Sequence, residues 1–182
     1  RYTRTGVIRS MDIPMGAWLT NGLASLATPV SWTNASDSLQ FADAVTNTTR
    51  VQFALPLTWG TGVVRWKFVM ASTITNSTTS TNVVYGIKGA SVASEGTWDS
   101  LTFGTQITFT NHIHRSPYVG IECVTGDLTI GNTPAANKPV VFELTRMTSD
   151  ATDVNTNTVS VISAQVFYTE SATEPTMPAT TQ

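Results

Sequence analysis

The segment VVRWKFVMAST (63–73) decides the fold class of this chain. Its large apolar side chains recur at every second position: Val64, Trp66, Phe68 and Met70. Arg65 and Lys67 alternate with them and face the other way, because successive side chains of a strand point to opposite sides. A period of two is typical of a strand with one buried face and one wet face. The segment is therefore predicted to be a half-buried strand.

Runs of similar character flank this segment on both sides. RVQFALPL (50–57) also places apolar residues at alternate positions, and Pro56 ends it. Polar turn-forming residues separate the runs, most clearly in ITNSTTSTN (74–82). The other predicted strands are 28–34, 83–93, 103–114, 117–126, 127–131, 139–148 and 158–170. About eight or nine strands with turns between them predict an all-β fold, an antiparallel, jelly-roll-like β-sandwich with little or no helix.

Composition favours the same fold class. Charged residues make up 12% of the chain and hydrophobic residues 41%, and 33 residues are Thr. Thr is β-branched and carries a hydroxyl group, so it suits the solvent face of a sheet. A chain of 182 residues is long enough for one sizeable core. We expect an extended basic N-terminal arm (1–12), a single β-sandwich domain (13–169) and a flexible C-terminal tail (170–182).

The charge distribution argues against two classes of partner. The net charge is −2, so the chain has no overall positive field for nucleic acid. No apolar run approaches the length of about 18 residues that a membrane span needs.

The single cysteine, Cys123, excludes an intramolecular disulfide. Arg1, Arg4 and Arg9 are candidates for binding an acidic protein partner, or they form a solvated arm.

Two pairs of residues are candidate metal ligands. His112 and His114 share one face of a predicted strand, although two imidazoles are too few for a closed site in one chain. Asp150 and Asp153 lie in SDATDVNTN (149–157), which resembles the first half of a calcium loop. Thr158 and Ala164 stand where an EF-hand loop requires Gly and Glu, so that motif fails. The alternatives are surface histidines and a turn in which Asp side chains cap the backbone.

The sequence contains no recognisable catalytic signature, and we expect a protein without enzymatic activity and without a cofactor. No nucleophile motif, metalloprotease motif or glycine-rich phosphate loop is present. Trp59, Trp98 and Tyr118 are candidate rings for stacking on sugars, since they lie in predicted loops or near their ends. The alternative is that such rings plug the ends of the sandwich.

Several small motifs recur in an order that is similar to one known group of proteins. They are Ile13–Pro14, ALPLTWGTG (54–62), VVYGIKGASVASEGTWDSLTFGTQITF (83–109), LTIGNTPAANKPVVFELTRMTSDATD (128–153) and ISAQVFYTE (162–170). Over roughly residues 7–169, the chain resembles the β-sandwich virion structural proteins of tailed bacteriophages. The resemblance is one of spacing and short motifs, and it carries no catalytic residues.

This resemblance implies a structural role without enzymatic activity on the exterior of a phage particle. The first expectation is a capsid decoration (cement) protein that binds the major capsid protein or another virion protein. The alternative is a tail-fibre or receptor-binding module that binds a host-surface glycan. By the same analogy, the protein is expected to be a homotrimer.

Overall fold

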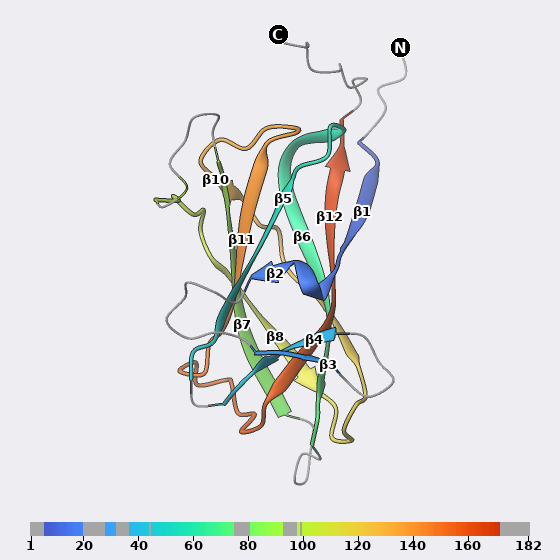
Figure 1. Ribbon diagram of the computed structural model, residues 1–182, viewed down its shortest axis with the longest axis vertical. Helices are drawn as coiled ribbons and strands as arrows, with labels where there is room; N and C mark the ends of the chain where they lie inside the picture. Colours follow the sequence, from blue (N-terminus) through green and yellow to red (C-terminus); the bar gives the residue numbers. More distant parts are fainter. Residues whose placement is uncertain are drawn as a thin grey trace.

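The computed structural model describes residues 6–19, 28–31, 37–43, 45–74, 81–92, 98 and 100–171. These residues form two six-stranded sheets, drawn as the two layers of a sandwich in Figure 1. The predicted all-β, antiparallel β-sandwich is thereby confirmed. The short 3-10 helix η1 (Met15–Ala17) is the one helical turn in the described part of the chain, and no helix there is long and apolar enough to cross a membrane.

The first sheet, called sheet A here, has β12 as its organising strand. The strand order is β3-β4-β12-β6-β9, and β1 also pairs with β12. The strands of sheet A are β1 (Ile8–Ile13), β3 (Thr28–Ser31), β4 (Asp37–Phe41), β6 (Trp59–Ser72), β9 (Ile121–Val124) and β12 (Val159–Glu170). All of their pairings are antiparallel.

The second sheet, called sheet B, packs its inner face against sheet A. The strand order is β10-β7-β11-β5-β2, and β8 also pairs with β7. The strands of sheet B are β2 (Trp18–Leu19), β5 (Thr48–Ala54), β7 (Thr81–Ser91), β8 (Ile107–Ile113), β10 (Ile130–Gly131) and β11 (Pro139–Arg146). The short pairing of β10 with β7 is parallel, and the other pairings are antiparallel.

The strand count differs from the expectation, since the described residues form twelve strands where about eight or nine were expected. The additional strands include β1, β2 and β4, which are two to six residues long. Residues 8–12 were assigned to the N-terminal arm, yet they pair with β12 from Thr169 to Gln165. Such short strands are set by the strands that they pair with, so their own sequence shows little periodicity.

The alternation in residues 63–73 is confirmed by the core. Val64, Trp66, Phe68 and Met70 of β6 are all buried. The Trp66 ring stacks on Phe68 at 5.6 Å and 4° and contacts Phe142 of sheet B, with centroids 5.0 Å apart. Aromatic pairs in these geometries add to the stability gained by burying their area. Trp66 therefore joins the two sheets at the centre of the core.

One irregularity of β12 opens a gap in sheet A. The first residues of β12, Val159–Val161, pair with β4, and residues from Ala164 onward pair with β1. The register with β6 shifts between Val161 and Ser163, which marks a β-bulge. Ile162 and Ser163 thus lie where the pairing with β4 has ended and the pairing with β1 has not begun.

Candidate functional site

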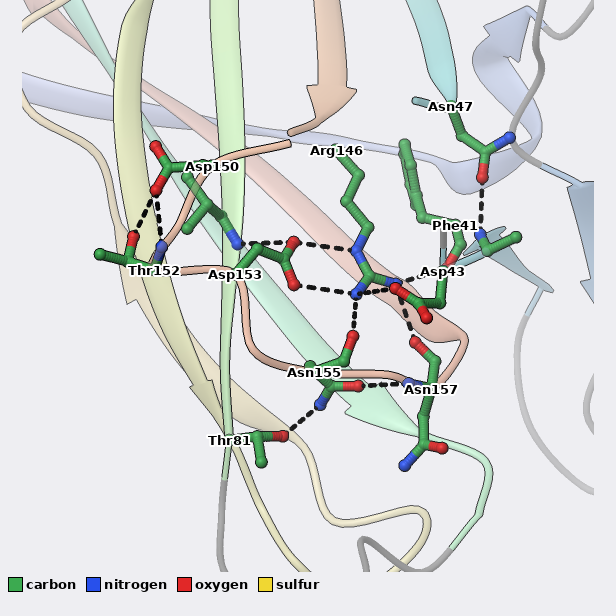
Figure 2. Close-up of polar contacts among 12 residues, drawn as sticks. Phe41, Asp43, Asn47, Thr81, Arg146, Asp150, Thr152, Asp153, Asn155 and Asn157 are labelled. Atoms are coloured by element: carbon green, nitrogen blue, oxygen red, sulfur yellow. Dashed lines mark hydrogen bonds and ion pairs between the residues drawn. The ribbon is translucent and has the colours of Figure 1, made fainter. Parts of the chain in front are cut away.

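The loop that contains Asp150 and Asp153 is organised by a buried arginine. Arg146, the last residue of β11, has no exposed side-chain surface, and Asp153 is 1% exposed. The guanidinium donates to both carboxylate oxygens of Asp153, from Nε at 3.1 Å and from Nη2 at 3.0 Å, as Figure 2 shows. The backbone N–H of Val84 also donates to Asp153. Asp153 is therefore the counter-ion of Arg146, and its oxygens are occupied by donors.

The same guanidinium binds three backbone carbonyl groups, which come from the end of β4 and from the 150–157 loop. Its Nη1 donates to the carbonyl oxygens of Phe41, at 3.2 Å, and Asn157, at 2.8 Å. Its Nη2 donates to the carbonyl oxygen of Asn155, and Asp43 lies 3.7 Å from it. Arg146 thus supplies hydrogen-bond donors to carbonyl groups at the edge of the core, where an unpaired polar group would cost free energy.

Asp150 caps its own turn. Its Oδ1 accepts hydrogen bonds from the backbone N–H of Thr152, at 2.9 Å, and from the Thr152 hydroxyl, at 2.7 Å. These hydrogen bonds hold the pKa of the Asp150 carboxyl below its ordinary value. Among the described residues, no three His, Cys, Asp or Glu side chains gather closely enough to hold a metal ion. The turn interpretation of SDATDVNTN agrees with this geometry.

The burial of Arg146 was not predicted, although its position in the sequence carries a signal for it. Within β11, the buried residues Val140, Phe142 and Leu144 share a register that points into the sandwich. Arg146 continues that register, so the period of two places a cation in the core. A buried cation requires a buried acid, and Asp153 is seven residues away.

The two candidate histidines make separate local contacts. His112 Nδ1 lies 3.0 Å from Asn82 Oδ1 on the neighbouring strand β7. His114 follows the end of β8, and its Nδ1 accepts a hydrogen bond from the Ser116 backbone at 3.0 Å. Both rings are therefore engaged by polar neighbours at the end of one strand, as expected of surface histidines.

The three candidate stacking rings do not form one platform. The expectation of an exposed Trp59 is wrong, because Trp59 begins β6 and is 4% exposed. Trp98 and Tyr118 are exposed, at 47% and 61%. Trp98 follows the C-terminal end of β7 in the sequence. The Tyr118 backbone N–H donates to the carbonyl oxygen of Ser72, the last residue of β6, and β6 is the strand that precedes the start of β7. These two rings therefore lie toward opposite ends of β7.

The predicted N-terminal arm and C-terminal tail lie only partly within the described residues. Arg9 lies in β1, and its Nε donates to Glu170 Oε2 at 3.0 Å, so it takes part in an intramolecular ion pair. Arg1, Arg4 and most of the predicted tail (172–182) lie outside the described residues. Cys123 is half-buried in β9, and burial raises the pKa of its thiol to about 12.

The outer face of sheet A gathers polar side chains around one aromatic ring. The strand register places Ser10 of β1, Phe167 of β12 and Arg65 of β6 in one row across the sheet. A hollow of about 170 Å³ lies on this face. It is lined by Ile8, Val63, Arg65, Asp127, Phe167, Tyr168 and Thr169. Phe167 is partly exposed there. The hollow therefore combines an apolar floor with charged groups at its rim.

A second row of polar side chains lies beside the first. It runs from Asp12 through Gln165 to Lys67. Gln165 Nε2 donates to Asp12 Oδ1 at 2.8 Å, and Lys67 Nζ lies 2.6 Å from Glu122 Oε1. These contacts fix the orientation of side chains that carry several hydrogen-bonding groups each.

Positive and negative charges on this face balance locally. Arg65 pairs with Asp127, and both side chains are more than half exposed. The hydrogen bond and the charge of Asp127 raise the pKa of Arg65, and the same hydrogen bond lowers the pKa of Asp127. Lys67 and Glu122 form a second ion pair on this face. The face offers many donors and acceptors without a strong net field.

Comparisons with known proteins yield structural likenesses only. No family model matches the chain, and no curated protein matches it. A xylan-binding module, CBM15, is similar with 10% identity and a TM-score of 0.49, over 92% of this chain and 100% of that one. The CBM22-1 xylan-binding domain from Paenibacillus barcinonensis Xyn10C has 10% identity and a TM-score of 0.46, over 94% and 100%.

A third likeness is of the same order. The family 11 carbohydrate-binding module from Clostridium thermocellum, in complex with a β-1,3-1,4-mixed-linked tetrasaccharide, has 8% identity and a TM-score of 0.48, over 86% of this chain and 94% of that one. At these identities and TM-scores, the likenesses assign no ligand to this chain.

Proposed function

We propose that this protein is a non-catalytic glycan-binding module and that it binds glycan on the outer face of sheet A. The observation that supports the proposal is the hollow over Phe167, where a partly exposed ring is flanked by Arg65 and Asp127. A sugar ring presents C–H groups on its faces and hydroxyl groups at its edge. Binding sites commonly combine an apolar surface with a few well-placed polar groups, which fix the ligand's orientation.

The ion pairs on this face suit a neutral ligand. Arg65 with Asp127, and Lys67 with Glu122, present both donors and acceptors to hydroxyl groups. A ligand of either charge sign would have to compete with the partner already present. Side chains held by a neighbour also lose less freedom on binding, which lowers the cost of association.

Substitution of Phe167 tests this proposal. Phe167→Ala is expected to weaken binding to a neutral polysaccharide at least about tenfold, equivalent to about 1.4 kcal/mol, because it removes the apolar floor of the hollow. Affinity electrophoresis through gels that contain xylan, β-glucan or galactan measures the retardation of the wild type and the variant. Circular dichroism confirms that the variant is folded.

Trp98→Ala provides the matched control, because Trp98 is an exposed ring away from the hollow. It should leave the retardation unchanged. Loss of binding in Trp98→Ala, with binding kept in Phe167→Ala, would transfer the site to the Trp98 loop. A wild type that no neutral polysaccharide retards would overturn the proposal.

A structural role on the exterior of a tailed-phage particle is the second function that we propose. Apart from the sequence resemblance, it is supported by apolar side chains exposed at Val7, Ile8 and Leu19, which are 45%, 71% and 55% exposed. Ile8 and Leu19 belong to the short strands β1 and β2. Contact with another virion protein or a second copy of the chain would remove this apolar surface from water.

Light scattering and co-sedimentation test this second role. The expected mass in solution is that of a trimer, three times 19.5 kDa, and the protein should sediment with phage capsids that lack their decoration protein. Ile8→Asp should reduce both associations, since it places a charge on the exposed apolar surface. A monomer at all micromolar concentrations, with no protein in the capsid pellet, would contradict the role.

A further inference from the structure

We infer that the glycan site extends along β12 from the hollow over Phe167 into a second hollow, so that its ligand is an extended, unbranched, neutral oligosaccharide. This inference rests on the proposed glycan-binding function. It goes further by naming the length of the ligand, the direction in which it lies and a second set of contacts.

The second hollow lies at the gap in sheet A. It has a volume of about 360 Å³, and its lining includes Asp12, Pro14, Gly16, Asp37 and Ser163. The gap arises because the pairing of β12 with β4 ends at Val161 and its pairing with β1 begins at Ala164. This volume lies in the range typical of small-molecule sites, about 300–1,000 Å³.

Both hollows open along the same two strands. Side chains at alternate positions of β12 share a face, so Ser163, Gln165 and Phe167 are neighbours on the outer side of sheet A. Ser163 lines the second hollow and Phe167 lines the first. In Figure 1, β1 lies alongside β12 over this length.

A hydrogen bond connects the two hollows. Asp12 lines the second hollow, and its Oδ1 accepts from Gln165 Nε2 at 2.8 Å. Gln165 is two residues from Phe167 on the same face of β12. The surface between the hollows is therefore polar and ordered, as a continuous ligand track requires.

The length of this track sets the size of the ligand. From Ser163 to Thr169 the strand advances by six residues, which is about 20 Å at about 3.4 Å per residue. This length is greater than that of a disaccharide. A ligand that fills the track is therefore an oligosaccharide of several units that lies along the strands. A branch at the middle units would meet Lys67 and Arg65 on the neighbouring strand β6.

The chemistry of the second hollow restricts the class of sugar. Its charged lining residues, Asp12 and Asp37, are both acids. Carboxylates accept hydrogen bonds from sugar hydroxyl groups and repel acidic sugars. Ile13 and Met15 add an apolar wall to the same hollow. A neutral glycan therefore fits both ends of the track, whereas a uronic acid polymer does not.

Titration with oligosaccharides of increasing length tests the inference. Isothermal titration of the full chain with xylo-, cello- and laminari-oligosaccharides of two to six units should show affinity that rises at least tenfold from the shortest to the longest in the series that binds. Asp12→Ala should remove that rise. Phe167→Ala should weaken binding at every length.

A second variant blocks the same hollow without removing a carboxylate. A Cβ atom at Gly16 would meet no heavy atom within 4 Å, so Gly16→Leu should fold and fill part of the hollow. It should also abolish the gain from longer ligands. If long and short oligosaccharides bind equally in the wild type, the extended track is overturned and the glycan-binding function stands. If no oligosaccharide or polysaccharide binds, the function itself is overturned, and this inference with it.

Discussion

Arg146→Met is expected to destabilise the protein by about 3–5 kcal/mol, because it leaves a buried carboxylate without its counter-ion. Asp153 would keep only the Val84 N–H among the donors that now surround its side chain. The carbonyl oxygens of Phe41 and Asn157 would also lose the hydrogen bonds that Arg146 donates to them. Urea unfolding followed by tryptophan fluorescence measures the loss as a lower midpoint at an unchanged slope.

A double variant separates the buried charge from the packing of the loop. Arg146→Met combined with Asp153→Leu should recover a large part of the lost stability, since apolar groups can replace a buried ion pair. Arg65→Gln is the matched control, because it breaks an exposed ion pair, and it should leave the urea midpoint unchanged. An Arg146→Met variant as stable as the wild type would show that the buried pair does not hold the loop in place.

Trp66→Ala should have an effect of similar size, about 3–5 kcal/mol, through the cavity that it leaves in the core. Trp66 has 0% exposure and contacts rings from both sheets, including Phe68 and Trp18 of strands β6 and β2. No single neighbour can fill the space of an indole, so the stacked geometry would be lost. Thermal and urea unfolding measure the change.

Trp98→Ala is the control for the core substitution. Trp98 is exposed, and surface changes of this kind usually fall within about 0.5 kcal/mol. Trp66→Phe should lie between the two, because it keeps a ring in the core and leaves a smaller cavity. Equal midpoints for the Trp66→Ala and Trp98→Ala proteins would contradict the assignment of Trp66 to the centre of the core.

The long central strands could be predicted from the sequence, because apolar and polar residues alternate along each of them. In β6 the apolar residues at 64, 66, 68 and 70 alternate with charged or partly exposed ones, and the structure buries the apolar set. In contrast, β1 reads as IRSMDI, in which the charged residues Arg9 and Asp12 interrupt any regular alternation. Its pairing with β12 joins residues that are more than 150 positions apart. Periodicity within a short segment cannot predict such a pairing.

Burial of individual rings and charges was harder to predict. Trp59 stands beside Gly60 and Thr58, which suggested a loop, yet its backbone pairs with Glu170 and its ring is buried in the core. Arg146 was not singled out in the sequence, although it is fully buried in the fold. In both cases burial depends on a neighbour that arrives from elsewhere in the fold: β12 for Trp59, and the 150–157 loop for Arg146.

The candidate glycan face could likewise be predicted only in part from the sequence. The alternation in 63–73 already placed Arg65 and Lys67 on the wet side of a strand. Only strand pairing brings Phe167, Gln165 and Asp12 beside them, and only the spacing of β4 and β1 along β12 leaves the second hollow between them. By itself, the sequence determined the all-β class and the wet and buried faces of its long strands, because a strand's period of two is a local property. The tertiary structure alone decided the edge strands, the Arg146–Asp153 pair and the binding face, because these depend on contacts between residues far apart in the chain.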